Sequence, residues 1–251
     1  MQNNPLLKNK LADGKTVLGT WCEIPSPEFI NVLAKGGLDF VIIDMEHGSC
    51  DFEQAGKMVM AAQVEGCSPI IRVPTNNEST ILRALELGAE GVIVPHVESA
   101  EERKRVIDAI KFPPIGIRSL NPYVRAGGYR STPDFTTQQN KNTLSAILVE
   151  SLQGIENIEE IIDDDYLDVV YMGSYDISAA LGLPGKTKHP KVVGVLEKMT
   201  KIITKSKKVA ACLFHSKDDL HFFKKNGVKF LCYKVDTAIV FDEIQRVRKL
   251  I

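Results

Sequence analysis

The chain has 251 residues, a formal net charge of -1, 44% apolar residues and 25% charged residues. This composition is ordinary for a globular protein with a large core, and the near-neutral charge gives no sign of a surface for nucleic acid or membrane. The sequence shows neither the apolar core of a signal peptide nor a run of ~18 apolar residues that would span a membrane. We therefore expect a cytoplasmic protein and, from its length, one domain over residues 1–251.

The five cysteines exclude two common structural devices. Their number is odd and no two have the C-x-x-C spacing, which argues against both structural zinc and a disulfide framework. Cys50 lies near the candidate site, where His47 would be the base for a thiol nucleophile, but a small structural residue is the preferred interpretation.

Short apolar runs alternate with amphipathic segments along the chain. After a polar N-terminal segment, strands are expected at 16–22, 40–44, 69–73, 91–95, 146–150, 169–172, 209–214 and 230–233. A helix is expected to start at Ser26-Pro27 and stop at Gly36, and further helices at 52–64, 78–87, 99–110, 155–162, 190–205, 216–225 and 238–250.

The repeated strand–helix order predicts the fold. The strands lack polar alternation, which indicates burial on both faces and a parallel sheet. Eight such units in a chain of this length predict a (β/α)8 TIM barrel. A doubly wound open sheet is the alternative, but its nucleotide-binding form needs a glycine-rich first turn, and the turn at 23–27 has no glycine.

A long segment at 112–143 interrupts the alternation before the fifth strand. It carries Arg118, Arg125 and Arg130, which are suited to binding an anion or a neighbouring subunit. A connection of this length usually serves function or assembly, although a solvated excursion remains the alternative.

Polar residues follow several of the predicted strands at the point where each strand ends. Active sites in barrels form at the C-terminal ends of the strands, so these side chains are expected to converge. They are Trp21, Asp44, His47, Arg72, His96, Glu150 and Asp176.

Glu150 and Asp176 are the candidate metal ligands. Two carboxylates on neighbouring strands, completed by water and substrate, suit a hard divalent ion such as Mg²⁺ or Mn²⁺. The alternative is that each carboxylate only caps the following helix.

The remaining polar residues suggest a clamp and a base. Arg72 could hold a substrate carboxylate through two parallel N–H bonds, or form an ion pair with Asp44 or Glu86, and the two roles can coexist. Asp44 is expected to orient His47 as a general base, with His96 in a supporting position. A metal, a clamp and a base together suit a 2-oxo acid that chelates the metal, and hence a metal-dependent aldolase acting through a metal-stabilised enolate.

Several motifs resemble the HpcH/HpaI aldolases in order and spacing from about Gly19 to the end of the chain. They are Asp44-x-Glu46-His47-Gly48, Ile71-Arg72-Val73-Pro74, Gly88-Ala89-x-Gly91-Val92-Ile93-Val94-Pro95, Glu150-x-x-x-Gly154, Gly173-x-x-Asp176-x-Ser178 and Val235-Asp236-Thr237.

The resemblance implies a phosphoenolpyruvate/pyruvate-type barrel and a class II pyruvate aldolase that cleaves a 4-hydroxy-2-oxo acid to pyruvate and an aldehyde, or runs the reverse. It gives the metal to Glu150 and Asp176, pyruvate binding to Arg72, and the base to His47 with Asp44; Trp21, at the end of the first strand, is expected to help bind the substrate. It also implies that the backbone of Gly173-Ser174-Tyr175 holds the pyruvate carboxylate and that Glu86 lies near the base of a neighbouring subunit. Relatives often exchange the eighth helix and form hexamers built from dimers, so a homo-oligomer is expected.

The sequence departs from the family pattern at positions that bear on the aldehyde partner. Ser174-Tyr175 replaces the usual Pro-Ala or Pro-Asn before the second ligand, Leu148 replaces a frequent Gln, and Ser119 replaces a Gly. Glu23 stands after the first strand, where a neutral residue is expected. These departures predict a substrate other than those of the best-known members.

Three other functions compete with this interpretation. Lys234, at the end of the eighth strand, could form a Schiff base in a metal-independent aldolase. A lyase acting on a coenzyme A ester is the second, and a barrel that binds a 2-oxo acid without turnover is the third, which Tyr175 would favour if it blocked the pocket.

Overall fold

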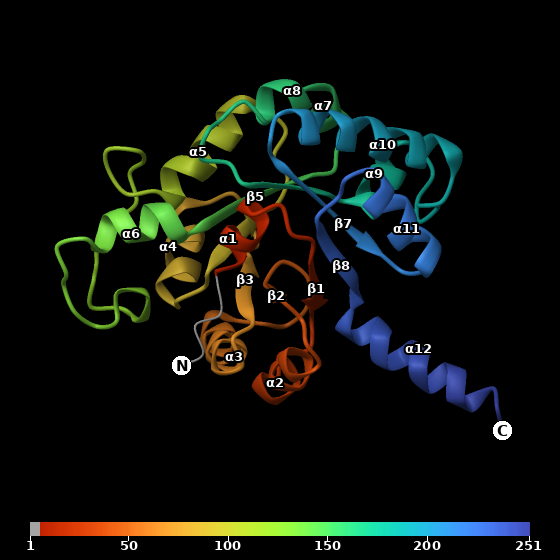
Figure 1. The fold of residues 1–251 in the computed structure, drawn as a ribbon, viewed down its shortest axis with the longest axis horizontal. Helices are drawn as coiled ribbons and strands as arrows, with labels where there is room; N and C mark the ends of the chain where they lie inside the picture. The colour runs from red at the N-terminus through yellow and green to blue at the C-terminus, as the bar shows by residue number, and fades with distance from the viewer. Residues whose placement is uncertain (1–5) are drawn as a thin grey trace.

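The structure is a computed structural model that describes residues 6–251. Its eight strands form one closed parallel barrel in sequence order, visible at the centre of Figure 1. The strands are β1 Val17–Cys22, β2 Phe40–Asp44, β3 Ser68–Arg72, β4 Gly91–Val94, β5 Leu144–Val149, β6 Val169–Met172, β7 Val209–Phe214 and β8 Phe230–Val235. Closure through the pairing of β1 with β8 confirms the predicted (β/α)8 barrel and excludes an open sheet.

The helices surround the barrel, and several begin at the predicted residues. They are α2 Pro27–Lys35, α3 Phe52–Val64, α4 Glu78–Glu86, α5 Ala100–Ile110, α7 Leu152–Glu156, α8 Ile158–Ile161, α9 Ser174–Ala180, α10 Pro190–Lys205, α11 Lys217–Lys225 and α12 Asp236–Arg248. The side chains of Ser26, Ser99 and Ser216 each accept a hydrogen bond from a backbone N–H in the first turn. Within residues 6–251 no helix is both long and apolar enough to cross a membrane.

The strands bury both faces because each face meets a different apolar cluster. On β2, Phe40 and Ile42 point into the barrel, whereas Val41 and Ile43 pack against the surrounding helices. Alternate side chains of a strand point to opposite faces, so a continuous apolar run is what this position between two cores requires.

An additional helix, α1 Leu7–Ala12, precedes the barrel, where we expected only a polar segment. Leu7 and Leu11 lie one helical turn apart and are buried in the cluster inside the barrel. Three of the six residues in this helix are polar, so its sequence pattern is weak. Its stability comes from covering the apolar barrel interior at the N-terminal end of the strands.

Two further helical segments differ from the prediction. The single helix expected at 155–162 is divided into α7 and α8, with Asn157 between them. Directly after β6 the chain enters the short helix α9, which we did not assign and which carries Asp176 in its first turn. The separate helix α10 then packs outside the barrel.

The 112–143 segment contains a 3-10 turn, η1 Arg125–Gly127, and the helix α6 Phe135–Asn142. Its base is anchored by the fully buried Lys111, whose Nζ donates to the carbonyl oxygens of Asn140 at 2.9 Å and Thr143 at 3.0 Å. Burial lowers the pKa of Lys111 to about 8. The segment is therefore packed at its ends, and its role in assembly stays a prediction.

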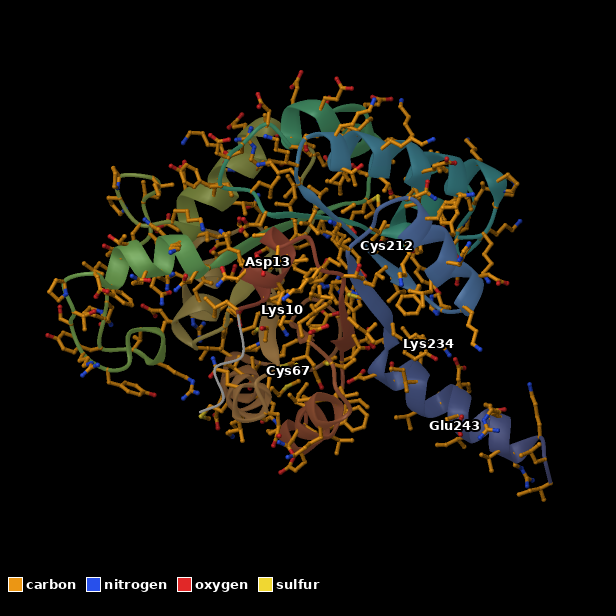
Figure 2. The ribbon with its side chains drawn as sticks, in the orientation of Figure 1. Lys10, Asp13, Cys67, Cys212, Lys234 and Glu243 are labelled. Carbon is orange, nitrogen blue, oxygen red and sulfur yellow. The ribbon has the colours of Figure 1, made fainter. Side chains whose placement is uncertain are left out.

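The last helix, α12, extends away from the barrel, as Figure 1 shows, and Glu243 in Figure 2 marks its outer part. It begins at Asp236, two residues earlier than expected, and exposes Phe241 and Ile244, each at 62%. The exposed apolar face of this helix is suited to packing against a second protein chain. Exchange of this helix between subunits stays a prediction.

The close contact of β4 with β5 gives a test of barrel packing. A Cβ added at Gly91 would lie 2.5 Å from the carbonyl oxygen of its register partner Leu144. We expect Gly91→Ala to lower the free energy of unfolding by about 1–3 kcal/mol, because the backbone would have to shift. The measurement is urea unfolding followed by circular dichroism.

Gly194 in α10 provides the matched control. A Cβ there meets nothing within 4 Å. Gly194→Ala should stabilise the protein by ~0.5–1 kcal/mol, because alanine favours a helix interior. Equal effects of the two substitutions would contradict the close approach of β4 and β5.

Candidate active site

Asp44 and Arg72 are register partners at the ends of β2 and β3. Arg72 Nε donates to Asp44 Oδ1 at 2.9 Å, and Arg72 Nη2 donates to Asp44 Oδ2. Asp44 is 1% exposed and Arg72 8%. Of the two ion pairs expected for Arg72, the one with Asp44 is formed. The guanidinium donates two parallel hydrogen bonds to the carboxylate, which the ammonium group of a lysine could not do.

The Asp44 carboxylate also holds the loop that follows β2. Its Oδ1 accepts from the backbone N–H groups of Glu46 at 3.0 Å and His47 at 3.1 Å. We expected the carboxylate to contact the imidazole of His47, but its hydrogen bond to His47 is through the backbone, while its side-chain partner is Arg72. Within residues 6–251 the exposed His47 imidazole makes no hydrogen bond, and it lines the cavity described below.

A second carboxylate, Glu46, extends the network across the barrel, and the sequence reasoning assigned it no role. Glu46 Oε2 lies 3.0 Å from Arg72 Nη1, and Glu46 Oε1 lies 2.9 Å from His96 Nε2. In the sequence, only its position two residues after Asp44, at the end of a predicted strand, indicated that Glu46 could belong to the site. Together with Asp44 it raises the pKa of Arg72, although burial alone would lower it.

His96 links this network to Glu150. Its Nδ1 lies 2.8 Å from Glu150 Oε1, and its backbone N–H donates to the same oxygen at 3.1 Å. The residue has a φ of 57°, an uncommon left-handed conformation for a side chain other than glycine. We expected His96 in a supporting position, and its imidazole lies between the Glu46 and Glu150 carboxylates.

The carboxylates of Glu150 and Asp176 are suited to a divalent cation because both are negatively charged and because Gly173 leaves room beside Glu150. Burial raises the pKa of Glu150 to about 7, His96 opposes this shift, and the negative charge of Asp176 adds to it. A Cβ on Gly173 would come within 2.9 Å of Glu150 Oε2, so this glycine leaves that oxygen accessible. Two adjacent carboxylates in this setting are a donor set that a hard cation stabilises.

The protein supplies few ligands to such a cation. No group of three or more His, Cys, Asp and Glu side chains in the described part of the chain is arranged to hold a metal. Water and substrate oxygens would have to complete the coordination, as is usual for Mg²⁺.

The candidate site opens into a cavity of about 280 Å³ at the C-terminal ends of the strands, which we call the first cavity. The expected site residues on its wall are Trp21, Asp44, His47, Arg72, Gly173, Ser174, Tyr175 and Asp176. The first turn of α9 begins at Ser174, and the first N–H groups of a helix lack intrahelical acceptors. This end of the cavity is therefore suited to a carboxylate.

Trp21 forms part of the first-cavity floor. Its Nε1 donates to the Tyr171 hydroxyl at 2.7 Å, and the guanidinium carbon of Arg72 lies 4.5 Å from the centre of its ring system. The indole is 6% exposed, so it fixes the position of Arg72 by stacking as well as by volume.

Two residues from the sequence analysis lie elsewhere. Glu86 lines a separate cavity between α3, α4 and the 112–143 segment, so any role beside a neighbouring subunit's base stays a prediction. Lys234 lies where β8 meets α12 (Figure 2), and its Nζ pairs with Asp242 at 2.7 Å. Hydrogen bonding to Asp242 raises the pKa of Lys234.

Asp236 is a buried support that sequence reasoning left without a role. Its carboxylate accepts from the backbone N–H groups of Glu23 at 3.0 Å, Ile24 at 3.0 Å and Thr237 at 2.7 Å. It is fully buried and ties the loop after β1 to the start of α12. The signal was present in the Val235-Asp236-Thr237 motif, but only the fold shows what it holds.

The Asp44–Arg72 pair gives a second testable prediction. Arg72→Met should lower the free energy of unfolding by about 3–5 kcal/mol, because it leaves a buried carboxylate unpaired. The double variant Asp44→Asn/Arg72→Met should recover part of this loss in a denaturation cycle. Lys57→Met breaks an exposed pair with Glu53 on α3 and should change little. A similar loss in Arg72→Met and Lys57→Met would contradict the buried pair.

Comparison with known proteins identifies the family of this chain. A model of the HpcH/HpaI aldolase/citrate lyase family matches residues 18–242. The 5-keto-4-deoxy-D-glucarate aldolase of Klebsiella pneumoniae subsp. pneumoniae is 29% identical over 248 residues, 97% of each chain. The citrate synthase SbnG has a TM-score of 0.90 at 27% identity, covering 98% of this chain and 96% of its own. The citrate lyase beta subunit of M. tuberculosis, solved with oxaloacetate and magnesium, shares the fold at 16% identity with a TM-score of 0.56, covering 88% of this chain and 92% of its own. The chain therefore belongs to the HpcH/HpaI aldolase/citrate lyase family.

Proposed function

We propose that this HpcH/HpaI-type aldolase cleaves a 4-hydroxy-2-oxo acid to pyruvate and an aldehyde, or joins the two, with a divalent cation held by Glu150 and Asp176. The observation that carries the proposal is the crowding of these two carboxylates at the end of the first cavity, where Asp176 lines the wall together with Arg72 and His47 and the negative charge of Asp176 acts on Glu150. When bound, Mg²⁺ or Mn²⁺ would supply Lewis-acid stabilisation for negative charge on the keto oxygen of the substrate.

The chain's own residues would bind the substrate and move the proton. Arg72 has N–H groups beyond those directed at Asp44 and Glu46, and these can bind a 2-oxo acid oxygen over the Trp21 ring. In cleavage, a base removes the proton of the C4 hydroxyl, the C3–C4 bond breaks to release the aldehyde, and pyruvate enolate takes a proton at C3. His47 is suited to this transfer because it lines the cavity and its imidazole makes no hydrogen bond to residues 6–251.

The arrangement of Tyr175 argues against a barrel that binds a 2-oxo acid without turnover. Tyr175 is 48% exposed and its hydroxyl is directed to His215 at 3.2 Å, so its ring lies at the rim of the cavity. A cavity of about 280 Å³ remains, near the lower end of the ~300–1,000 Å³ typical of small-molecule sites.

Self-association is part of the proposal. The apolar residues that α12 exposes include Val240, Phe241, Ile244 and Val247, and the 112–143 segment exposes Ile117, Leu120, Tyr123 and Tyr129. Both features support a homo-oligomer with an exchanged last helix, built from dimers into a hexamer. Small 2-oxo acids and aldehydes are the proposed substrates.

The third prediction separates the metal from the base. With Mg²⁺ or Mn²⁺ present, the protein should exchange the methyl protons of pyruvate for deuterium in deuterated water. Asp176→Ala should lose both exchange and Mn²⁺ affinity, the latter measured by calorimetry. His47→Ala should retain Mn²⁺ but lose exchange by about 10²–10⁴-fold, the range for removing a general base.

Glu197→Gln on the exposed face of α10 is the matched carboxylate control and should behave as the unsubstituted protein. No exchange with either metal would overturn the proposed function. Exchange with the methyl protons of acetyl-coenzyme A in place of pyruvate would favour the coenzyme A ester alternative. Retained Mn²⁺ affinity in Asp176→Ala would contradict the ligand assignment.

The fourth prediction concerns the Schiff-base alternative. An imine-forming lysine needs a lowered pKa, but the Asp242 carboxylate raises the pKa of Lys234. Borohydride with pyruvate should therefore give no covalent adduct by mass spectrometry, whereas a chelator should abolish exchange. An adduct on Lys234 together with activity in chelator would reverse the assignment.

A further inference from the structure

A second cavity adjoins the first at the C-terminal end of the barrel. It has a volume of about 320 Å³ and lies between α10, α11 and the end of β7. Ser174 and Leu213 line both cavities, so the two lie side by side. A substrate longer than pyruvate could extend from one cavity into the other.

The rim between the cavities carries a tyrosine–histidine pair. Tyr175 lines the first cavity and His215 the second, and the Tyr175 hydroxyl lies 3.2 Å from His215 Nε2. Their rings meet edge to face, with centroids 6.0 Å apart. A hydroxyl and an imidazole can each donate or accept, so this pair is suited to bonding a substrate hydroxyl. Burial lowers the pKa of His215. The negative charges of Asp219 and Asp242 oppose this shift, the positive charges of Lys234 and Lys188 add to it, and the net lowering favours the neutral imidazole.

The cationic side chains that line the two cavities are already paired with carboxylates. Arg72 bonds Asp44 and Glu46, and Lys188 lies 3.5 Å from Asp219. Within residues 6–251 no other lysine or arginine lines either cavity. A second carboxylate on a substrate would therefore find no uncommitted guanidinium or ammonium group there.

Negative charge at the mouth would also oppose such a carboxylate. Glu23 lines the first cavity and Asp218 the second. Burial raises the pKa of Glu23, and the nearby charges of Asp44 and Asp236 raise it further, which reflects the crowding of carboxylates at this end. A divalent cation would balance Glu150 and Asp176. Within residues 6–251 Glu23 forms no ion pair, although the charges of His47 and Arg72 oppose the rise in its pKa.

We propose that the second cavity is the subsite for the aldehyde, and that the Tyr175–His215 pair selects short hydroxyaldehydes while Glu23 disfavours aldehydes with a carboxylate. The inference rests on the proposed function. In the synthetic direction, C3 of pyruvate loses a proton and bonds to the aldehyde carbon, and the carbonyl oxygen takes a proton to become the C4 hydroxyl. The pair would bond a further hydroxyl of the aldehyde and is not the base.

The test measures aldol addition and pyruvate proton exchange in the same metal-loaded protein. Exchange needs no aldehyde, so it reports the proposed function alone. D-glyceraldehyde and glycolaldehyde should be used at least ~tenfold more efficiently, as kcat/KM, than succinate semialdehyde, because like charges in a binding site repel. Absent exchange would overturn the proposed function. Normal exchange with equal or reversed aldehyde preference would overturn the inference by itself.

Three variants assign the preference to residues. Tyr175→Phe and His215→Asn should each lower the ratio of D-glyceraldehyde addition to exchange by roughly three- to tenfold, the effect of one lost hydrogen bond. Glu23→Gln should raise the efficiency with succinate semialdehyde relative to D-glyceraldehyde. Tyr166→Phe, on the exposed loop before β6, is the matched tyrosine control and should leave the ratio unchanged.

Two outcomes would contradict the role of the pair. If Tyr175→Phe lowers exchange as much as addition, the hydroxyl serves the pyruvate half of the site and selects no aldehyde. If neither Tyr175→Phe nor His215→Asn changes the ratio while exchange is retained, the pair does not contact the aldehyde. Thermal unfolding of Tyr175→Phe should match the parent, because the Tyr175 side chain is about half exposed.

Discussion

The ion pair between Asp44 and Arg72 is the interaction on which the rest of the site depends. It joins the ends of two neighbouring strands whose register is set by the closed barrel. Arg72 neutralises a carboxylate that is 1% exposed, and that carboxylate in turn holds the backbone of the loop carrying Glu46 and His47. A buried pair of this kind is stable only if both partners are satisfied, so the position of the loop that carries His47 follows from the position of Arg72.

From this pair a polar network continues through Glu46 and His96 to Glu150. It places several carboxylates at one end of a barrel that is otherwise apolar inside. Burial and the charge of Asp176 make it unfavourable for Glu150 to ionise, and the raised pKa of Glu150 reflects this. A cation between Glu150 and Asp176 would stabilise both ionised carboxylates. Gly173 makes the approach of α9 to Glu150 possible, since a side chain there would collide with the carboxylate.

The parts of the chain outside the barrel have a different character. The barrel buries its own apolar residues in two clusters, one inside the strands and one beneath the helices. In contrast, α12 and the 112–143 segment present large apolar side chains to solvent. Exposed apolar surface of this kind in a well-packed protein is typical of an interface, and both segments flank the barrel without completing its core.

The barrel and most of its candidate site could be predicted from the amino-acid sequence, because continuous apolar runs, capped helices and polar strand ends are local signals. Eight strands were predicted, three of them with the observed bounds. The strand ends predicted Trp21, Asp44, His47, Arg72 and Asp176 on the wall of the first cavity, and the family resemblance added Gly173, Ser174 and Tyr175. What the sequence could not determine were contacts that depend on strand register and closure. Only the tertiary structure shows that the side-chain partner of Asp44 is Arg72 and not the His47 imidazole. It also shows that His96 connects Glu46 with Glu150. The three backbone donors of Asp236 and the contact of Tyr175 with His215 depend on the fold in the same way. Helices α1, α6 and α9 were not predicted. Each is short, and packing against the barrel or its strand ends stabilises α1 and α9 more than their own residues do.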